Sequence, residues 1–250
     1  MLEQRFFLNQ HYIEYVRLLF ELHKAISEGW DESEKGETLR ERMDEPGSQL
    51  SSDEIASVNG IAADFYSLTD PPSSATPAMS ANTWTALQSV FQPQYSSVFH
   101  KAFALLREHA GSIPPASLAY LRGKLWTEVG ENRIAAAFLE RASDLDPHNT
   151  NFRYRALHAL WKANSGSAKE MAQAILSNWE QHPPRLVLKA LDVLLQFIRA
   201  ESKDHTRKEV KSFIPIFEHS IFQFETSGEV ESEPDLLVKS FSHLDYCQHF

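Results

Sequence analysis

Apolar and polar residues alternate with the period of an α-helix along most of this chain. Between residues 10 and 28 the apolar positions recur every three or four residues and share one helix face: Tyr12, Val16, Leu19, Phe20, His23 and Ile26. Asn9 is a residue type that caps helix starts, and Gly29 is one that ends helices. The pattern therefore predicts a helix over 10–28.

Two further helices are expected before residue 70. Residues 31–45 are acidic with little apolar periodicity, so we expect a short helix that ends at Pro46-Gly47. Ser51 and Glu54 have the spacing of a capping box, with Leu50 placed to pack on Ile55. The helix that they begin should run to about Leu68 and bury five apolar residues: Ile55, Val58, Ala62, Phe65 and Tyr66.

Proline and serine then interrupt the pattern. Residues 69–81 contain three prolines and no apolar period, which is typical of a linker. Helical periodicity resumes afterwards with short breaks, over 82–92, 95–110, 115–129, 131–145, 149–164, 167–181, 184–201 and 204–224. No segment alternates as a strand does, so the sequence predicts an all-α fold. We divide it into a helical region at 1–70, a linker at 71–81, a helical array at 82–224 and an acidic, less ordered tail at 225–250.

Charge follows the same division. The net charge of −10 is distributed as −9 over residues 1–80, +4 over 81–200 and −5 over 201–250. An acidic chain does not attract a phosphate backbone, which argues against nucleic acid as a partner. The basic middle could instead bind an acidic protein segment, including the acidic ends of this chain.

The single cysteine and the absence of an apolar leader or span indicate a location. Cys247 has no partner for an intramolecular disulfide, which fits a reducing compartment. The N-terminal residues lack the basic-then-apolar order of a signal peptide, and charges cut every apolar stretch short of a membrane span. We therefore expect a cytoplasmic protein without membrane contact.

Residues 116–149 carry the one recognisable motif. Gly123, Trp126, Ala135, Ala142 and Pro147 have the small-residue, aromatic and proline spacing of a 34-residue antiparallel helix pair, and the segment resembles a tetratricopeptide repeat. It departs from that family in two places: Ala119 stands where a tryptophan is preferred and Arg122 where a leucine is preferred. Residues 150–183 form a degenerate second unit, and weaker pairs flank both at 82–110 and 184–224. Residues 18–68 separately resemble a helical stretch of uncharacterised bacterial proteins, which implies no activity.

The resemblance implies a binding face. In tetratricopeptide arrays the first helix of each pair lines the inner surface, which holds a peptide. By position, this predicts a peptide-binding face made of Tyr120, Lys124, Thr127, Asn151, Tyr154, His158 and Lys162. Lysine and asparagine there could hold a carboxylate through charge-assisted hydrogen bonds.

The sequence contains few residue patterns that are typical of catalytic or metal-binding sites. His243, Asp245, Cys247 and His249 could form a metal site only on a strand that aligned them, and a loose tail is the more ordinary interpretation. No nucleophile elbow, phosphate loop or zinc-protease motif occurs. The aromatic residues lie on apolar helix stripes and are expected in the core: Trp84, Phe91, Phe99, Phe103, Trp126, Phe138 and Trp161.

Three functions remain open at this point. The leading hypothesis is a non-catalytic adaptor or regulator that binds a peptide or acidic segment on the inner face and needs no cofactor. The alternative is a structural or regulatory subunit whose groove is filled by its own N-terminal region. An enzyme of unknown type on a helical scaffold is the least favoured.

Overall fold

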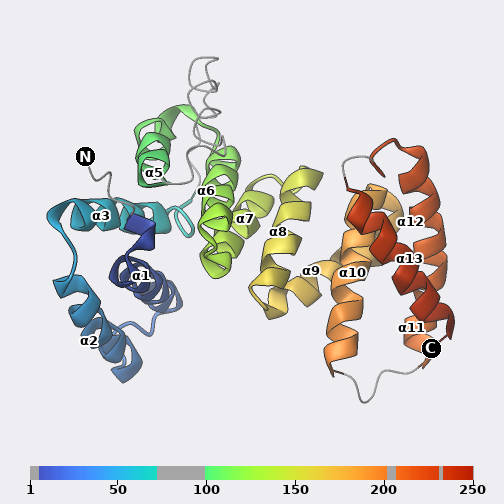
Figure 1. The fold of residues 1–250 in the computed structure, drawn as a ribbon, viewed down its shortest axis with the longest axis horizontal. Helices are drawn as coiled ribbons and strands as arrows, with labels where there is room; N and C mark the ends of the chain where they lie inside the picture. Colours follow the sequence, from blue (N-terminus) through green and yellow to red (C-terminus); the bar gives the residue numbers. More distant parts are fainter. Residues whose placement is uncertain (1–5, 72–98, 202–206, 231–232, 250) are drawn as a thin grey trace. The chain divides into compact units, whose positions relative to one another are not determined.

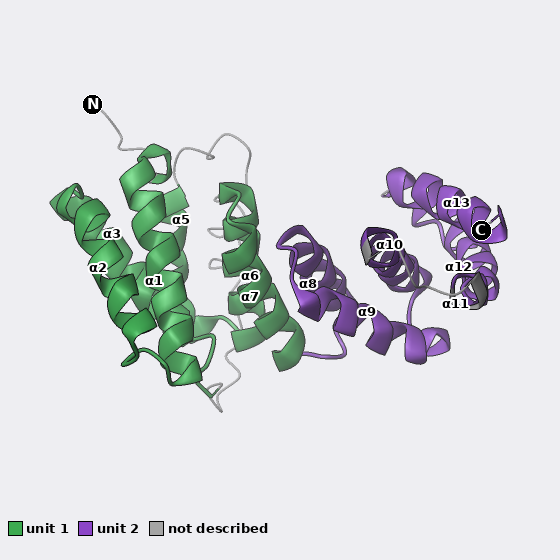
Figure 2. Ribbon diagram, turned by 90° about the horizontal axis from the view of Figure 1, so that it is seen from below, with its two compact units in different colours: residues 1–145 green, residues 146–250 purple. Residues whose placement is uncertain are grey.

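The computed structural model describes residues 6–71, 99–201, 207–230 and 233–249 (Figure 1). Within these ranges every regular element is a helix and no strand occurs, which confirms the all-α fold. The chain forms two compact units, Met1–Leu145 and Asp146–Phe250 (Figure 2), and each is described by itself below.

The first unit begins with a short 3₁₀ turn and contains six described α-helices. With a second 3₁₀ turn, its described elements are η1 (Phe6–Leu8), α1 (Gln10–Glu28), α2 (Glu34–Ser48), α3 (Ser52–Tyr66), α5 (Phe99–Glu108), the turn η3 (Ala110–Ser112), α6 (Pro115–Val129) and α7 (Asn132–Leu145). Helices α6 and α7 form a closely packed pair, while α1 packs on both α2 and α3, and α5 packs on α3 and α6. Residues 1–71 and 99–145 therefore share one unit.

The predicted helix caps are present. The side chain of Asn9 accepts a hydrogen bond from the His11 N–H at 3.0 Å, and Gly29 ends α1 with a φ of 74°, which favours glycine because it has no Cβ. At the start of α3, Ser51 and Glu54 form the expected capping box. Asn9 Nδ2 also donates to Glu54 Oε1 at 2.8 Å, so one carboxylate joins the starts of α1 and α3.

Two details of the N-terminal helices differ from expectation. Helix α2 continues through Pro46 and ends at Ser48. In the last turn a proline removes only one backbone hydrogen bond, and the Pro46 ring is buried, so the helix does not end there. In α3, Ile55 and Tyr66 are 46% and 49% exposed, whereas Val58 and Phe65 are buried as expected. The buried stripe of α3 is therefore narrower than its apolar sequence pattern.

Aromatic rings form the centre of the first unit. Phe7 in η1 lies edge-on to Tyr12 and Trp126, with ring centroids 5.2 and 5.7 Å apart. Phe103 is 4.7 Å from Trp126, and Phe65 lies 6.1 Å from Phe138. These contacts bring η1, α1, α3, α5, α6 and α7 to a single core. The predicted core position of Phe103, Trp126 and Phe138 is thus confirmed.

The second unit is built around one long apolar helix. Its elements are α8 (Thr150–Lys162), α9 (Gly166–Ser177), the turn η4 (Trp179–Gln181), α10 (Pro184–Glu201), α11 (Arg207–Ser212), α12 (Ile214–Thr226) and α13 (Pro234–His249). Helix α10 contacts α8, α9, α12 and α13, which explains why its residues 186–195 are all buried.

The C-terminal part of this unit requires two corrections. Residues 207–226 form two helices that meet at Phe213, because Pro215 fits the first turn of a new helix better than the interior of a continuous one. The expected loose tail is instead the packed helix α13. Its buried residues follow helical spacing: Leu236, Ser240, His243 and Cys247. The acidic composition of 225–250 had led us to expect a tail without a buried helix face.

Some predictions are not tested by this structure. Most of the predicted linker, the helix at 82–92, and Trp84 and Phe91 lie outside the described residues. The four-part division of the chain stays a prediction, while the compact units meet at residues 145 and 146. In the described ranges, no helix combines the length and apolar character that crossing a membrane requires.

Candidate functional site

The predicted binding face is divided between the two units. Tyr120, Lys124 and Thr127 lie on α6 of the first unit, and the other four residues lie on α8 of the second. Each group has the spacing of one helix face. We describe the two groups separately, and their joint action as one face remains a prediction.

The three residues on α6 lie next to its close crossing with α7 at Gly123. An added Cβ on Gly123 would lie 2.6 Å from Leu139 Cγ, so the close helix crossing needs glycine here. On the same turn of α6, Lys124 is exposed, and the Thr127 hydroxyl donates to the Gly123 carbonyl at 3.0 Å. Tyr120 is half-buried against the aromatic core. Of the three, Lys124 is the side chain that solvent reaches most freely.

The most buried charges of the first unit lie on the other side of α6. Arg122 is 5% exposed and donates through Nη2 to Asp64 Oδ1, while Arg107 Nη1 donates to Asp64 Oδ2 at 2.9 Å. Arg122 Nη1 donates to the Ser67 hydroxyl at 2.8 Å. Arg122, which the predicted repeat alignment places where leucine is preferred, is therefore matched by an acidic partner on α3. That departure from the repeat pattern was the available clue to this site.

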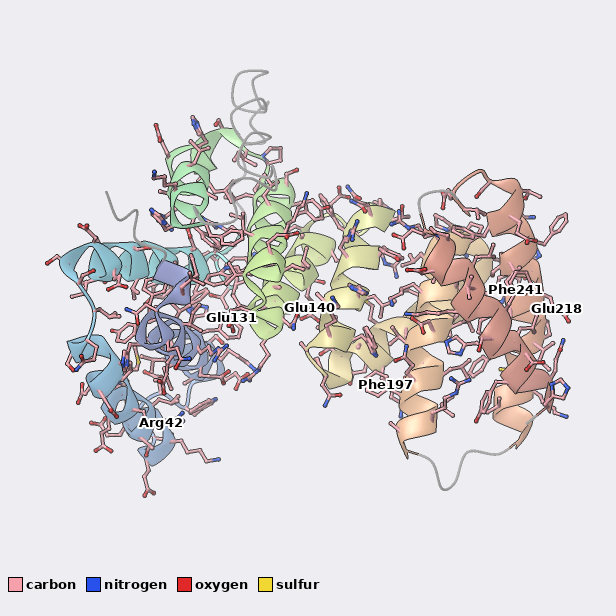
Figure 3. The ribbon with its side chains drawn as sticks, viewed as in Figure 1. Arg42, Glu131, Glu140, Phe197, Glu218 and Phe241 are labelled. Atoms are coloured by element: carbon pink, nitrogen blue, oxygen red, sulfur yellow. The ribbon has the colours of Figure 1, made fainter. Side chains whose placement is uncertain are left out.

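A second set of ion pairs joins α1 to the α6–α7 connection. Arg17 binds Glu131 through two hydrogen bonds of 2.9 and 2.6 Å, and Arg133 pairs with Glu21 at 2.7 Å. A groove of about 980 Å³ runs beside these pairs, and its lining includes Arg42 of α2 and Glu131. Both side chains are labelled in Figure 3. The polar side chains of the groove are largely engaged with each other, and exposed pairs of this kind contribute little to stability.

In the second unit the α8 residues have different environments. Asn151 and Lys162 are exposed, His158 is half-buried, and Tyr154 is buried. Burial, followed by the charges of Lys189, Lys162 and Arg155, lowers the pKa of His158 to about 4. The imidazole is therefore neutral at physiological pH and can serve only as a hydrogen-bonding or packing group there.

Tyr154 is part of a carboxylate-binding arrangement. Its hydroxyl donates to Glu233 Oε2 at 3.0 Å, and Arg185 Nη2 donates to the other oxygen, Oε1, at 2.5 Å. The Arg185 guanidinium stacks 4.2 Å from the Tyr154 ring centroid. Burial and the Glu233 carboxylate raise the pKa of Tyr154 to about 12, so the phenol stays protonated and donates. The site accepts one glutamate carboxylate with both of its oxygens bound.

A buried polar cluster lies farther along α10. Lys189 Nζ and Gln196 Nε2 donate to the two oxygens of Asp192 at 2.9 and 2.6 Å, and His243 Nε2 lies 3.0 Å from Asp192 Oδ1. Burial would raise the pKa of Asp192, but these three partners hold it well below its usual range. The Lys189 ammonium also lies 4.9 Å from the Trp161 ring centroid. The cluster ties α13 to α10.

The sequence-based metal candidate is not assembled. On helix α13, His243 and Cys247 face the core, while Asp245 and His249 are exposed and interact with each other. Burial raises the pKa of the Cys247 thiol to about 11, so it is not a thiolate near neutral pH. No cluster of three or more metal-ligating residues occurs among the residues that the structure describes.

Comparison with known proteins gives no further identification. Neither the family models, the curated proteins nor the solved structures contain a match to this chain. The likeness to a tetratricopeptide repeat therefore rests on the residues of 116–149 and on the close pair of helices, α6 and α7, that these residues form.

Proposed function

We propose that this protein is a non-catalytic, tetratricopeptide-like interaction module that binds an acidic protein segment along α8. The observation that carries the proposal is the pair of hydrogen bonds that Tyr154 and Arg185 donate to the Glu233 carboxylate. Two donors on neighbouring helices, α8 and α10, bind both oxygens of one glutamate. An acidic side chain of another protein would meet the same two donors if it replaced Glu233.

Other features support binding through this face. Lys162 and Arg155 are exposed on α8 and add positive charge beside His158. Charges of this kind raise the rate of encounter with an acidic partner and are screened by salt. The packed pairs α6–α7 and α8–α9 are the supersecondary unit from which helical repeat arrays are built.

A second candidate function is favoured by the same contacts. Asp64 of the acidic N-terminal region neutralises Arg107 and Arg122, and Glu233 of the acidic C-terminal region occupies Tyr154 and Arg185. A structural or regulatory subunit would use its own acidic segments in this way permanently. The two candidates differ in whether Glu233 can be displaced.

Displacement can be measured directly. A fluorescent peptide with the sequence of residues 228–236 would be titrated with the full-length protein, and its anisotropy recorded at low and high salt. The adaptor proposal expects weak binding to the wild type and binding at least tenfold tighter to Glu233→Ala, which leaves Tyr154 and Arg185 open. Adding Arg185→Gln to Glu233→Ala should abolish the gain, and Asp235→Ala is the matched control for charge removal near Glu233.

The opposite result would support the structural candidate. If Glu233→Ala lowers the stability of the fold and captures no peptide at either salt concentration, the Glu233 contact serves the fold alone.

A separate test addresses the predicted basic face. Changing Lys124 and Lys162 to glutamate should weaken capture and leave helicity by circular dichroism unchanged, because both side chains are exposed.

A further inference from the structure

A small cavity in the first unit has no role in the interactions described so far. Its volume is about 130 Å³, several times the roughly 30 Å³ that one water molecule occupies in the liquid. It lies where the end of α3, the start of α6 and the end of α7 meet. Polar lining comes from Ser67, Asp70, Arg122 and Arg141, and apolar lining includes Leu118 and Leu145.

Both arginines of this cavity have an unused donor. Arg122 Nε and Arg141 Nε are buried and have no hydrogen-bond partner among the described residues. Buried polar groups are nearly always hydrogen-bonded, so two such guanidinium nitrogens on one cavity are unusual. Ser67 cannot supply an acceptor for both of them, because its oxygen already accepts from Arg122 Nη1 and its hydroxyl donates to the Asp64 carbonyl.

Among the described residues, Asp64 is the one carboxylate that accepts hydrogen bonds from the arginines beside the cavity. Asp64 is shared between Arg122 and Arg107, so one carboxylate serves two guanidinium groups. Burial lowers the pKa of Arg122, and the nearby charge of Arg107 lowers it further, while Asp64 acts in the opposite direction. Arg141 Nη2 donates only to the backbone carbonyl of Asp70. The Asp70 carboxylate also lines the cavity, and the charge of Arg141 acts on Asp144, so the site lacks an acceptor for the two Nε–H groups and not a counter-charge.

We propose that the cavity binds a small oxyanion of the phosphate class between Arg122 and Arg141. Two N–H donors on separate guanidinium groups suit a ligand with several acceptor oxygens, and the volume accommodates one tetrahedral ion. Leu118 and Leu145 form apolar walls of the cavity, and hydrogen bonds between a guanidinium and an anionic oxygen are stronger than those between neutral groups. This site lies in the first unit and does not depend on the proposed peptide face of α8.

Inorganic phosphate is the probe for this site. Isothermal titration calorimetry on the full-length protein, at pH 7.5 and constant ionic strength set with KCl, should show one phosphate site with a dissociation constant of millimolar or below. Arg141→Gln should weaken binding at least tenfold, because it removes one guanidinium. Arg42→Gln removes an exposed positive charge on α2 and is the matched control that should leave binding unchanged.

Two further variants separate the cavity from general charge effects. Ala119→Leu keeps every charge but fills part of the cavity, so it should also weaken phosphate binding. Asp70→Asn removes an exposed carboxylate from the lining and should tighten binding several-fold. Circular dichroism checks that each variant is folded. The proposal is overturned if the wild type takes up no phosphate, if chloride competes equally well, or if Arg141→Gln and Arg42→Gln bind phosphate with the same affinity.

Discussion

Asp64 of α3 holds the guanidinium of Arg122 of α6 inside the first unit, where the two residues are only 2% and 5% exposed. Arg107 of α5 binds the second oxygen of the same carboxylate. The ion pair fixes the position of the N-terminal helices on the α6–α7 pair. It also accounts for a charged residue at a buried position of α6.

Removing the carboxylate should therefore be costly. We expect Asp64→Ala to lower the free energy of unfolding by about 3–5 kcal/mol, because it leaves buried guanidinium groups without a counter-charge. Urea denaturation measures the change. The double variant Asp64→Leu with Arg122→Leu should recover much of this loss, since an apolar pair needs no charge compensation. Equal stability of Asp64→Ala and the wild type would show that the pair is dispensable.

The helix crossing at Gly123 gives a second prediction. Gly123→Val should destabilise the protein by about 1–3 kcal/mol, because Leu139 fills the space that a side chain at position 123 would need. Ala135→Leu, at a buried position of α7, should cost a similar amount of roughly 1–3 kcal/mol. Gly166→Ala is the matched control, since nothing lies within 4 Å of its added Cβ. Unchanged denaturation midpoints for both core variants would contradict the repeat alignment.

Cys247 should be chemically silent in the folded protein. Its side chain is fully buried, and burial raises the pKa of the thiol to about 11. Because the thiolate is the reactive form, we expect no measurable modification by a water-soluble disulfide reagent at pH 8 within minutes. Rapid and complete reaction should appear once urea unfolds the chain. Fast modification without urea would mean that α13 leaves the unit readily.

The lowered pKa of His158 should reduce the free energy of unfolding in mild acid. Its pKa is about 4 in the folded protein, below the model-compound value of 6.5, so the unfolded chain takes up a proton between these values that the folded chain does not. The contribution of His158 is neutral above pH 7 and becomes increasingly unfavourable as the pH falls from about 6.5 towards 4. His158→Gln should flatten the decrease of the urea midpoint in this window. Parallel pH curves for the two proteins would refute the assignment.

The helices themselves were largely predictable from local sequence. Asn9, Ser51 and Gly29 act at helix ends through neighbouring backbone atoms, so their effect can be inferred without knowing the fold. The apolar spacing of 10–28 and the small residues of 116–149 likewise predicted the faces that are buried. These interactions span only a few residues or one helix pair.

What could not be predicted depends on partners distant in sequence. Ile55 has the spacing of a core residue, yet it is 46% exposed. Arg122 and Lys189 are buried because Asp64 and Asp192 neutralise them. Tyr154 was placed on a solvent-facing surface, and the structure buries it against Glu233. The acidic C-terminal sequence gave no indication that Glu233, the residue directly before α13, supplies that carboxylate.

The contact between Phe7 and Trp126 also constrains the order in which the protein can fold during its synthesis. Phe7 leaves the ribosome well before Trp126 of α6, the ring against which it packs. The aromatic core of the first unit cannot form until α6 has been translated. Until then the apolar turn η1 is exposed to solvent or bound by a chaperone. Slower translation before α6 would therefore lengthen the time during which the nascent chain is open to aggregation.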